Sequence, residues 1–353
     1  MDTNYLSAEK VRGFISDVFS GLGMPKEDAA LCADLMVRTD LSGADGHGVF
    51  RLPQYSGRIK AGGINLHPKM KLLQDAPSIG LLHGDNAMGH LVMHRCAEMA
   101  IKKAQLTGIG WMGCCYGNHA GAGSTYANLV SEAGFVGIYM AVGSANHMAP
   151  WGGVDPLLST NPIAISIPTG PQKAPVVLDM ATTVAAYGKV KMKAQAGEPM
   201  PVGWMIDKKG NPLTDPNRSS EGTLLPIGDY KGYGLSLMIA LLAGSMNGAA
   251  VGSQLVDFND DDTAVTNTGQ TIIAVNPAFL GGIEQFMASS GQLIHEIKSS
   301  KPLPNQPKIR VPGDGAAQAQ QKRTQEGIPI PAGLLKKLNE CAVLAGVEPI
   351  KLS

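Results

Sequence analysis

His47 and Arg51 are the two residues best suited to chemistry, because they are four positions apart. If the chain is helical from Gly48 onward, their side chains share one helix face, with Cβ atoms roughly 5–6 Å apart. An arginine fork can bind a carboxylate through two hydrogen bonds, while a neighbouring histidine exchanges a proton with an oxygen on the adjacent carbon. A 2-hydroxy or 2-oxo acid presents these two groups in that relation. A helix-capping histidine and a surface ion pair explain the local pattern equally well.

Three further segments place small or charged residues at the expected start of a helix or end of a strand. Residues 118–123, with the sequence NHAGAG, form a loop that opens a helix, and such loops bring backbone amides close to planar or anionic ligands. An ordinary strand-to-helix turn is the alternative there. Tyr230 and Lys231 begin an apolar helix, where a lysine is placed for a phosphate. Asp179 ends a strand, which is where α/β proteins place ligand-binding residues.

Several other patterns resemble functional motifs without their structural context. Residues 108–113 match GxGxxG, but here a helix precedes the glycines and a strand follows, the reverse of the dinucleotide-binding order. His90, His94 and Glu98 are spread over two helical turns, so we expect a polar helix face rather than a zinc site. The acidic run 260–262 is expected to be a solvated loop. The sequence therefore predicts no metal site.

The elements that must position these residues follow from hydrophobic spacing. Apolar residues at helical intervals predict helices over 7–22 and 25–41, the first with a Ser7 N-cap. The small-residue loop 42–46 then leads into a third helical stretch that carries Arg51 and Tyr55. These helices form an N-terminal helical lobe.

From about residue 72 the pattern alternates between strands and helices, which predicts an α/β protein. Strands are expected at 109–113, 135–142, 163–167, 176–180 and 271–275, and helices at 90–107, 124–133 and 231–246. The last helix is nearly all apolar, so we expect it to be buried on most sides. A proline-rich connector over 302–312 leads to two C-terminal helices.

Composition narrows the class of protein. The 353 residues carry 29 basic and 29 acidic side chains, and a protein that binds nucleic acid needs a basic surplus. The N-terminus lacks the pattern of a signal peptide, and the most apolar stretch, about ten residues over 234–243, is shorter than the ~20 that a spanning helix needs. Five cysteines without a framework spacing fit a reducing compartment. We expect a cytoplasmic globular protein with no nucleic-acid or membrane partner.

Seven ordered segments resemble the malate/L-lactate dehydrogenase family of the non-Rossmann type. This family also includes sulfolactate, ureidoglycolate and 2,3-diketogulonate oxidoreductases and a piperideine-2-carboxylate reductase. The segments are GHGVFRL (46–52), MAPWGG (148–153), STNPIA (159–164), VLDMAT (177–182), LLP (224–226), KGYG (231–234) and RVPG (310–313). The resemblance runs from about residue 5 to residue 350. It implies the malate/L-lactate (sulfolactate) dehydrogenase-like fold, which agrees with rejecting the GxGxxG match.

The resemblance also implies an activity and a set of site residues. The expected enzyme interconverts a 2-hydroxy acid and a 2-oxo acid with NAD or NADP, as a homodimer whose active sites lie near the subunit interface. His47 would be the proton donor and acceptor, Arg51 the carboxylate clamp and Thr160 a further substrate contact. The residues that would line the cofactor site are His119, Ala120, Gly121, Ala122, Gly123, Asp179, Met180, Ala181, Tyr187, Gly188, Tyr230, Lys231, Lys308, Arg310, Pro312, Gly313 and Asp314.

Three positions depart from the family pattern. Gly46 stands where most members have serine, Lys189 where the imine-reducing branch has an acid, and Ala120 where an aromatic residue is common. The serine and the acid form a relay with the histidine in the imine-reducing branch, and this chain lacks both. His47 therefore has less help in stabilising its imidazolium, and Lys189 would favour the neutral ring or bind a second anion of the substrate. This favours a hydroxy acid or oxo acid substrate. The alternatives are a cyclic imine reductase, a catalytically silent nicotinamide-binding relative, and a cofactor-independent hydrolase or lyase.

The expected domain organisation has three parts. Residues 1–72, joined by the C-terminal helices at 310–353, form the helical lobe with His47 and Arg51. Residues 73–120 and 240–309 form a central α/β cofactor-binding domain, and residues 121–239 form an inserted α/β domain.

Overall fold

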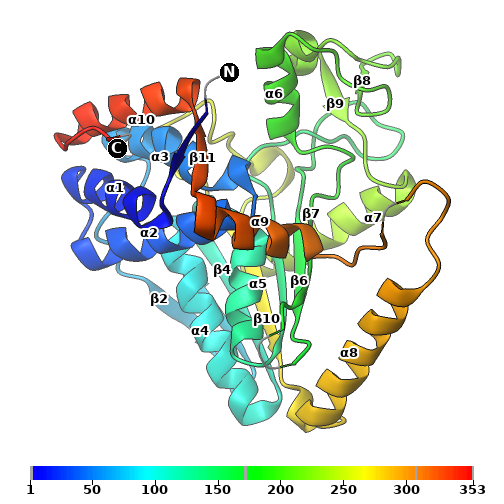
Figure 1. Cartoon of the computed structure of the whole chain (residues 1–353). Helices are drawn as coiled ribbons and strands as arrows, with labels where there is room; N and C mark the ends of the chain where they lie inside the picture. The colour runs from blue at the N-terminus through cyan, green and yellow to red at the C-terminus, as the bar shows by residue number, and fades with distance from the viewer. Residues whose placement is uncertain (1–2, 171–172, 307, 352–353) are drawn as a thin grey trace.

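The computed structural model describes residues 3–170, 173–306 and 308–351 (Figure 1). Its α-helices are α1 (Ala8–Gly21), α2 (Lys26–Leu41), α3 (Leu52–Ala61), α4 (Gly89–Thr107), α5 (Gly123–Glu132), α6 (Tyr187–Ala196), α7 (Tyr230–Ile239), α8 (Ile283–Ser299), α9 (Asp314–Glu326) and α10 (Ala332–Ala345). Its strands are β1 (Thr3–Leu6), β2 (Lys71–Asp75), β3 (Ile79–His83), β4 (Ile109–Gly117), β5 (Val136–Ala141), β6 (Ile163–Ile167), β7 (Val176–Met180), β8 (Met205–Asp207), β9 (Gly222–Leu224), β10 (Thr268–Val275) and β11 (Ile328–Pro331).

A seven-stranded mixed sheet forms the centre of the molecule, in the order β2-β3-β4-β10-β5-β6-β7. β3 and β4 run parallel, and the other neighbouring strands are antiparallel. The expected strands at 163–167 and 176–180 are confirmed at both ends, as β6 and β7, and the expected strands at β4, β5 and β10 are confirmed with different ends. The α/β class is therefore confirmed. The three-part domain division stays a prediction, and the sheet is continuous across its boundary near residue 120.

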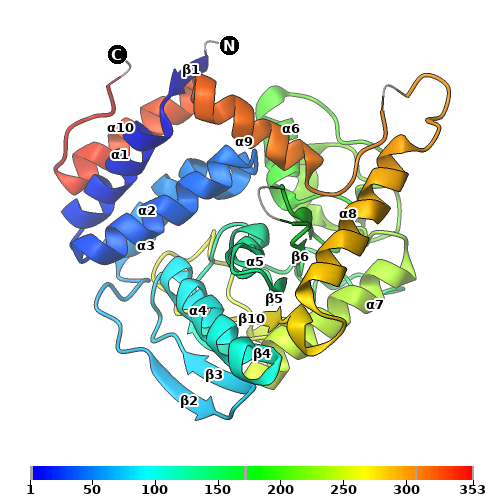
Figure 2. The ribbon, with the colours of Figure 1, turned by 60° about the horizontal axis from the view of Figure 1, so that its bottom comes forward.

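Helices cover both faces of this sheet because side chains alternate along its strands. Tyr139 and Ile272 belong to the core under α4 and α5. Their neighbours Met140 and Ile273 point the other way and pack against Ile239 at the end of α7. In Figures 1 and 2, α4 and α5 lie together on one side of the strands.

The helical N-terminal lobe packs α1, α2, α3 and α10 around one apolar core (Figure 2). The expected N-cap of α1 is confirmed, since the Ser7 hydroxyl accepts a hydrogen bond from the Lys10 backbone N–H at 3.2 Å. The apolar face of α1, from Val11 to Phe19, is buried in this core. β1 pairs with β11, which brings the two ends of the described chain together. The two expected C-terminal helices are confirmed as α9 and α10.

The helix expected at 231–246 is wrong in two respects. α7 ends at Ile239, and a π-helical turn (Ala240–Gly244) and a 3₁₀ turn (Ser245–Asn247) follow it. The segment packs on the sheet through one side, while its other side is exposed. The exposed apolar side chains are Met238, Leu241, Leu242 and Met246. An all-apolar sequence carries no polar residues to mark its outer side, so periodicity could not show which side packs.

α8, which the sequence did not predict, projects from the body of the molecule in Figures 1 and 2. None of its described side chains is buried, although Leu293 and Ile297 are large and apolar. No helix in the described ranges is long and apolar enough to cross a membrane.

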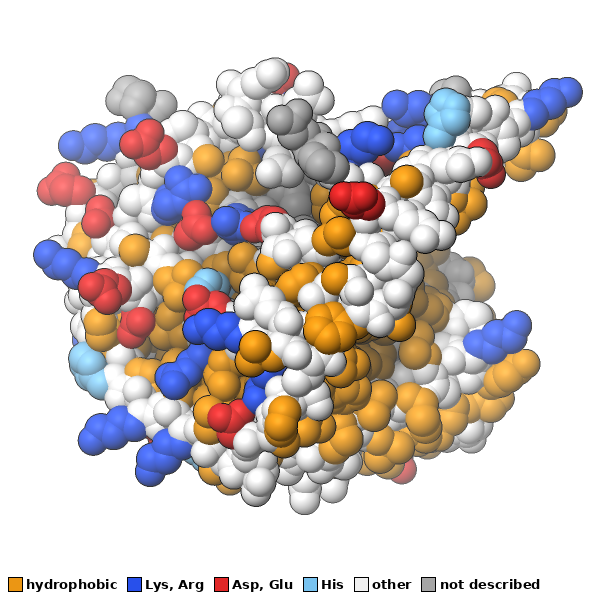
Figure 3. All heavy atoms as spheres, turned by 90° about the horizontal axis from the view of Figure 1, so that it is seen from below, with side chains coloured by type: hydrophobic (Ala, Val, Ile, Leu, Met, Phe, Trp, Pro, Cys, Tyr) orange, Lys and Arg blue, Asp and Glu red, His pale blue; other side chains and the backbone are white. Residues whose placement is uncertain are grey.

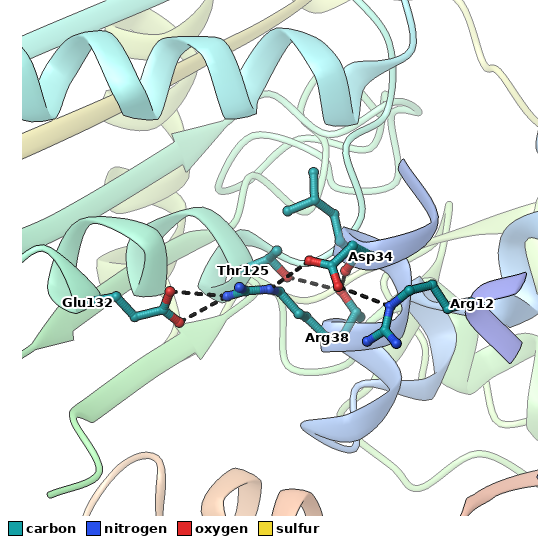
Figure 4. A network of polar contacts seen from close by, with 7 residues as sticks. Arg12, Asp34, Arg38, Thr125 and Glu132 are labelled. Carbon is teal, nitrogen blue, oxygen red and sulfur yellow. Dashed lines mark hydrogen bonds and ion pairs between the residues drawn. The ribbon is translucent and has the colours of Figure 1, made fainter. Parts of the chain in front are cut away.

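A network of charged side chains joins the helical lobe to α5 (Figure 4). Asp34 on α2 bonds Arg12 of α1 at 3.1 Å and Arg38 of α2 at 3.0 Å. Arg38 also bonds Glu132 at the end of α5, and the Thr125 hydroxyl bonds a threonine of α2 at 2.9 Å. Exposed ion pairs each add at most about 1 kcal/mol, but together these contacts fix α5 relative to the helix that leads to His47.

Candidate active site

His47 and Arg51 lie on two consecutive 3₁₀ turns, Asp45–His47 and Val49–Arg51. Gly48 separates the turns with φ −94° and ψ −134°, so His47 and Arg51 do not share one continuous helix, and the helical stretch expected to carry Arg51 and Tyr55 begins after Gly48. A hydrogen bond from Arg51 Nε to the Gly46 carbonyl oxygen, 2.8 Å long, closes the loop instead. The guanidinium is thereby held beside the turn that carries His47.

Three aromatic rings form a column next to Arg51. The rings of His47 and His119 stack with centroids 5.6 Å apart and planes at 21°, and His119 stacks on Phe258 at 5.1 Å and 15°. Arg51 Cζ lies 5.9 Å from the Phe258 centroid. The sequence predicted His47 and Arg51 as partners and assigned His119 to the cofactor, and the structure brings all three together.

Two donors determine the tautomer of His119. The Tyr55 hydroxyl lies 2.6 Å from His119 Nδ1, and the Gly121 backbone N–H points to the same atom from 3.4 Å. A backbone N–H can only donate, so Nδ1 is the accepting nitrogen. The proton of the neutral ring is therefore assigned to Nε2.

His90, at the second residue of α4, lies buried behind this column. Its ring is 1% exposed and contacts Tyr55 edge-on, with centroids 5.6 Å apart. Within the described chain neither ring nitrogen has a hydrogen-bond partner. A Cβ on Gly121, where φ is +76°, would lie 3.0 Å from His90 Nε2, so the loop closes over His90 at a glycine. The polar helix face expected for His90 is wrong.

Burial keeps these rings uncharged. It lowers the pKa of His47 to about 4, with a smaller contribution from the Arg51 charge, and lowers the pKa of His90 to about 3. It also lowers the pKa of His119 well below its ordinary value and raises the pKa of the Tyr55 hydroxyl. Arg51 stays charged, and it forms no ion pair with any residue in the described ranges. The site therefore presents one uncompensated cation among neutral rings.

Asp40, at the end of α2, contacts the loop between His47 and Arg51 and helps to hold it in place. Its carboxyl is 1% exposed and accepts a hydrogen bond from the Val49 backbone N–H at 2.8 Å. A Cβ on Gly48 would lie 2.0 Å from Asp40 Oδ1, so the carboxyl fits only against a glycine. Arg323 of α9 donates to the Asp40 carbonyl oxygen at 2.6 Å and pairs with Asp45. Burial raises the pKa of the Asp40 carboxyl to about 8.

The end of β7 gathers several of the residues expected at the cofactor. Asp179 Oδ2 accepts a hydrogen bond from the Ser124 backbone N–H, 2.8 Å long, at the start of α5. Beyond Met180 and Ala181, Thr182 donates through its backbone N–H and its hydroxyl to the Thr160 carbonyl oxygen, at 2.9 and 3.0 Å. The Thr182 carbonyl oxygen accepts from Ile227, just before α7. The loop 119–123 thus connects the ring column to this end of the sheet.

The remaining expected site residues lie around this centre. Tyr230 and Lys231 are exposed at the start of α7. The Pro312 carbonyl oxygen accepts from the Val177 backbone N–H at 3.1 Å, and Gly313 and Asp314 border a pocket of about 270 Å³ beside β7. Lys308 and Arg310 are exposed in the segment before α9.

At the start of α6, Tyr187 stacks on His147 with ring centroids 3.9 Å apart. Gly188 follows it and faces open space, since a Cβ there would meet no atom within 4 Å. His147 is a further neutral histidine, because burial lowers its pKa to about 4. No sequence pattern had singled it out.

The departures from the family pattern have different structural consequences. A Cβ on Gly46 would meet no atom within 4 Å, so a serine would fit there and glycine leaves space beside His47. Lys189 is exposed on α6, and no hydrogen bond or ion pair among the described residues joins it to His47. Ala120 is buried, and its carbonyl oxygen accepts from the Tyr126 hydroxyl at 2.5 Å.

Sequence reasoning missed Tyr55 as a site residue, and it missed Phe258 entirely. Tyr55 lies four positions after Arg51 on α3, a spacing that could have identified it. Phe258 is a single aromatic residue in a polar loop, and its place follows from tertiary contacts that no local pattern encodes.

Comparison with known proteins places this geometry in a family. Residues 6–339 match the family described as malate/L-lactate dehydrogenase. The chain belongs to the malate/L-lactate dehydrogenase family. The curated relatives named below are dehydrogenases of 2-hydroxy acids, so the expected enzyme class and the family's mixed α/β fold are confirmed.

Individual relatives cover nearly the whole chain. Malate dehydrogenase from Pyrococcus horikoshii is 37% identical over 358 residues, covering 99% of this chain and 98% of the relative. The NAD(+)-named ureidoglycolate dehydrogenase of Escherichia coli is 35% identical, with 92% of each chain covered. The solved structure of sulfolactate dehydrogenase from Methanocaldococcus jannaschii superposes with a TM-score of 0.90 at 35% identity and 98% coverage of both chains. The chain is thus similar to malate/L-lactate dehydrogenase family members with different named substrates.

Proposed function

We propose that this chain interconverts a 2-hydroxy acid and a 2-oxo acid, with His47 exchanging the proton of the C2 oxygen and Arg51 binding the carboxylate. The observation that carries this proposal is the uncompensated Arg51 beside the neutral ring column. A bidentate carboxylate would neutralise the Arg51 charge and orient C2 toward the histidines. Thr160 would contribute a further substrate contact next to Thr182.

The residues around β7 fit a nicotinamide cofactor, NAD or NADP. Gly188 leaves open space beside its backbone, Lys231 is an exposed cation, and Gly313 borders a cavity beside the start of β7. We propose that these residues and the 119–123 loop hold the dinucleotide. The chemistry that a bound nicotinamide supplies is hydride transfer to or from C2.

The proton chemistry is set by the state of His47. As a neutral imidazole it accepts the proton of the hydroxy acid during oxidation. During reduction it must first take up a proton, and the same nitrogen then protonates the new C2 oxygen. Burial is the larger cause of the low pKa of His47, and a substrate carboxylate on Arg51 would offset the smaller one, the Arg51 charge, and so assist this uptake.

The test is the loss of reduced-nicotinamide absorbance, with NADH and NADPH separately. Substrates would be pyruvate, oxaloacetate, sulfopyruvate, a diketo sugar acid and piperideine-2-carboxylate. We expect turnover of an oxo acid, a collapse of turnover in His47→Ala with cofactor binding retained, and a raised KM in Arg51→Ala. Turnover of the cyclic imine alone would replace the proposed substrate class. Cofactor binding without any turnover would indicate a silent relative.

We also propose a homodimer that works in the cytoplasm. The exposed apolar side chains of α8 and of the π-helical segment supply candidate contact surfaces, and hydrophobic side chains gather over part of the face shown in Figure 3. The five cysteines are free and buried, which suits a reducing compartment.

A further inference from the structure

Arg51 is held by a chain of side-chain amides that leads away from the rings. Its Nη1 donates to Gln54 Oε1 at 2.8 Å, and Gln54 Nε2 donates to Asn259 Oδ1 at 3.1 Å. Asn259 Nδ2 in turn donates to Asp257 Oδ1 at 2.6 Å. The chain therefore connects the start of α3 to the loop that carries Phe258.

The direction of this chain follows from its two ends. A guanidinium only donates and a carboxylate only accepts, so each amide between them has one permitted orientation. Gln54 must present its oxygen to Arg51 and its NH₂ group to Asn259. A fixed amide gives the guanidinium one preferred plane.

The loop at the far end is itself anchored to α3. Arg58, which is 1% exposed, donates to the carbonyl oxygens of Asp261 at 2.5 Å and Ala264 at 2.7 Å. The loop thus returns to the helix that begins after Arg51. This places Asn259 at a defined distance from Gln54 and keeps Phe258 in the ring column.

Gln54 holds Arg51 without neutralising it. Of the five N–H donors of a guanidinium, one bonds the Gly46 carbonyl and one bonds Gln54, and three stay available on Nη1 and Nη2. That is enough for a carboxylate bound through two hydrogen bonds. A glutamate at position 54 would instead pair with Arg51 and compete with the substrate for its charge.

We propose that Gln54 and Asn259 are positioning residues that orient Arg51 for the substrate carboxylate and preserve its charge. This inference rests on the proposed function, in which Arg51 is the carboxylate clamp. It assigns acid selectivity to the amide pair as well as to the arginine.

The experiment compares Gln54→Glu, Gln54→Leu, Asn259→Ala and the Leu/Ala double variant in the full-length enzyme. Gln74→Glu, on the exposed strand β2, is the matched charge control. Each variant is assayed with pyruvate or oxaloacetate, whichever the wild type turns over faster, and with the corresponding C1 amide. The measurements are kcat, KM and the Kd for NADH from fluorescence titration.

We expect Gln54→Glu to raise the KM for the acid about tenfold or more, with little change in kcat, in the KM for the amide or in the Kd for NADH. A distorted site would raise the KM for the acid and for the amide alike. The ratio of the two KM values therefore separates a loss of the Arg51 charge from a general distortion. Gln54→Leu and Asn259→Ala should each raise the acid KM severalfold. The double variant should be no worse than Gln54→Leu, because both changes break one chain.

The inference would be overturned if Gln54→Glu and Gln74→Glu showed the same ratio of acid KM to amide KM. It would also be overturned if the double variant raised the acid KM by the product of the two single effects. If Arg51→Ala still raised the acid KM, the proposed function would stand. A wild-type enzyme that turned over neither oxo acid would overturn both.

Discussion

At the scale of single residues, the low pKa of His47 predicts opposite pH profiles for the two directions of the reaction. Burial and Arg51 lower this pKa to about 4, so His47 in the free enzyme is neutral near pH 7. Oxidation needs the neutral ring, so its kcat/KM should be flat between about pH 6 and 8 and fall only as the pH approaches 4. Reduction needs the protonated ring, so its kcat/KM should fall about tenfold per pH unit over the same range.

Steady-state rates in both directions across this pH range check the prediction. His47→Gln should abolish the dependence along with most of the activity, while His67→Gln, in an exposed loop, should retain the wild-type profiles. A reduction rate that stays level up to about pH 6.5 would show that the proton comes from a group with an ordinary histidine pKa.

The types and spacing of His47 and Arg51 suggested a carboxylate and proton site, although a helix cap and a surface ion pair fitted the local pattern equally well. The rest of the site depends on contacts between segments far apart in the chain, such as Tyr55 with His119 and Arg51 with Phe258. A local pattern carries no record of these contacts. His90 shows the limit clearly, because helical spacing placed it on a polar face with His94 and Glu98, whereas the fold buries its ring behind Tyr55.

At the scale of elements, the loop between the two 3₁₀ turns depends on Gly48. A Cβ there would lie 2.0 Å from Asp40 Oδ1, so Gly48→Ala must push the loop away from α2. We expect a loss of about 1–3 kcal/mol in stability and a fall of at least about tenfold in kcat/KM, since His47 and Arg51 move apart.

Chemical unfolding and steady-state kinetics measure the two effects. Gly13→Ala, where a Cβ would meet no atom within 4 Å on an exposed face of α1, is the control; it should leave kcat/KM close to the wild type and raise stability by up to about 1 kcal/mol, because alanine favours the helix. A fully active Gly48→Ala enzyme would show that Asp40 does not support the loop. Replacing Asp40 with Asn should be tolerated better than Ala, because the amide oxygen can still accept from Val49.

Elements with a single clear period were predictable, and elements without one were not. β6 reads IAISI and its burial alternates, so its limits were confirmed at both ends. The segment after α7 has apolar residues on every side, and its π-helical turn ends at Gly244, where a Cβ would collide with Val142 and Val251. α8 is an exception, because Ile283, Phe286, Ile294 and Ile297 repeat at helical spacing and could have predicted it, although that pattern could not show that none of these side chains is buried.

At the scale of the whole molecule, the buried histidines predict sensitivity to acid. The pKa values of His47, His90 and His147 are lowered to about 4, 3 and 4, and that of His119 is lowered well below its ordinary value. In the unfolded chain these groups bind protons below about pH 6.5, so unfolding takes up protons and stability falls as the pH drops from 6.5. Each such proton contributes a slope of about 1.4 kcal/mol per pH unit.

Urea unfolding between pH 5 and 8 measures this slope. The raised pKa of Asp40 acts in the opposite sense, since the unfolded carboxyl releases its proton above about pH 4, and stability then declines as the pH rises to about 8. His90→Gln should reduce the acid slope, whereas His295→Gln on exposed α8 should leave it unchanged. Equal slopes in both variants would mean that His90 is protonated in the folded protein.

The exposed apolar surfaces lead to the last prediction, which concerns assembly. Leu293 on α8 is 57% exposed and Leu241 in the π-helical turn is 45% exposed, and burying such side chains against a second copy removes about 25 cal/mol of unfavourable hydration per Å². Light scattering after gel filtration should give twice the mass of one chain at micromolar concentration. Leu293→Glu should yield a monomer, while Val343→Glu on α10, also exposed, should remain dimeric. A monomeric wild-type enzyme with full activity would show that the site is complete within one chain.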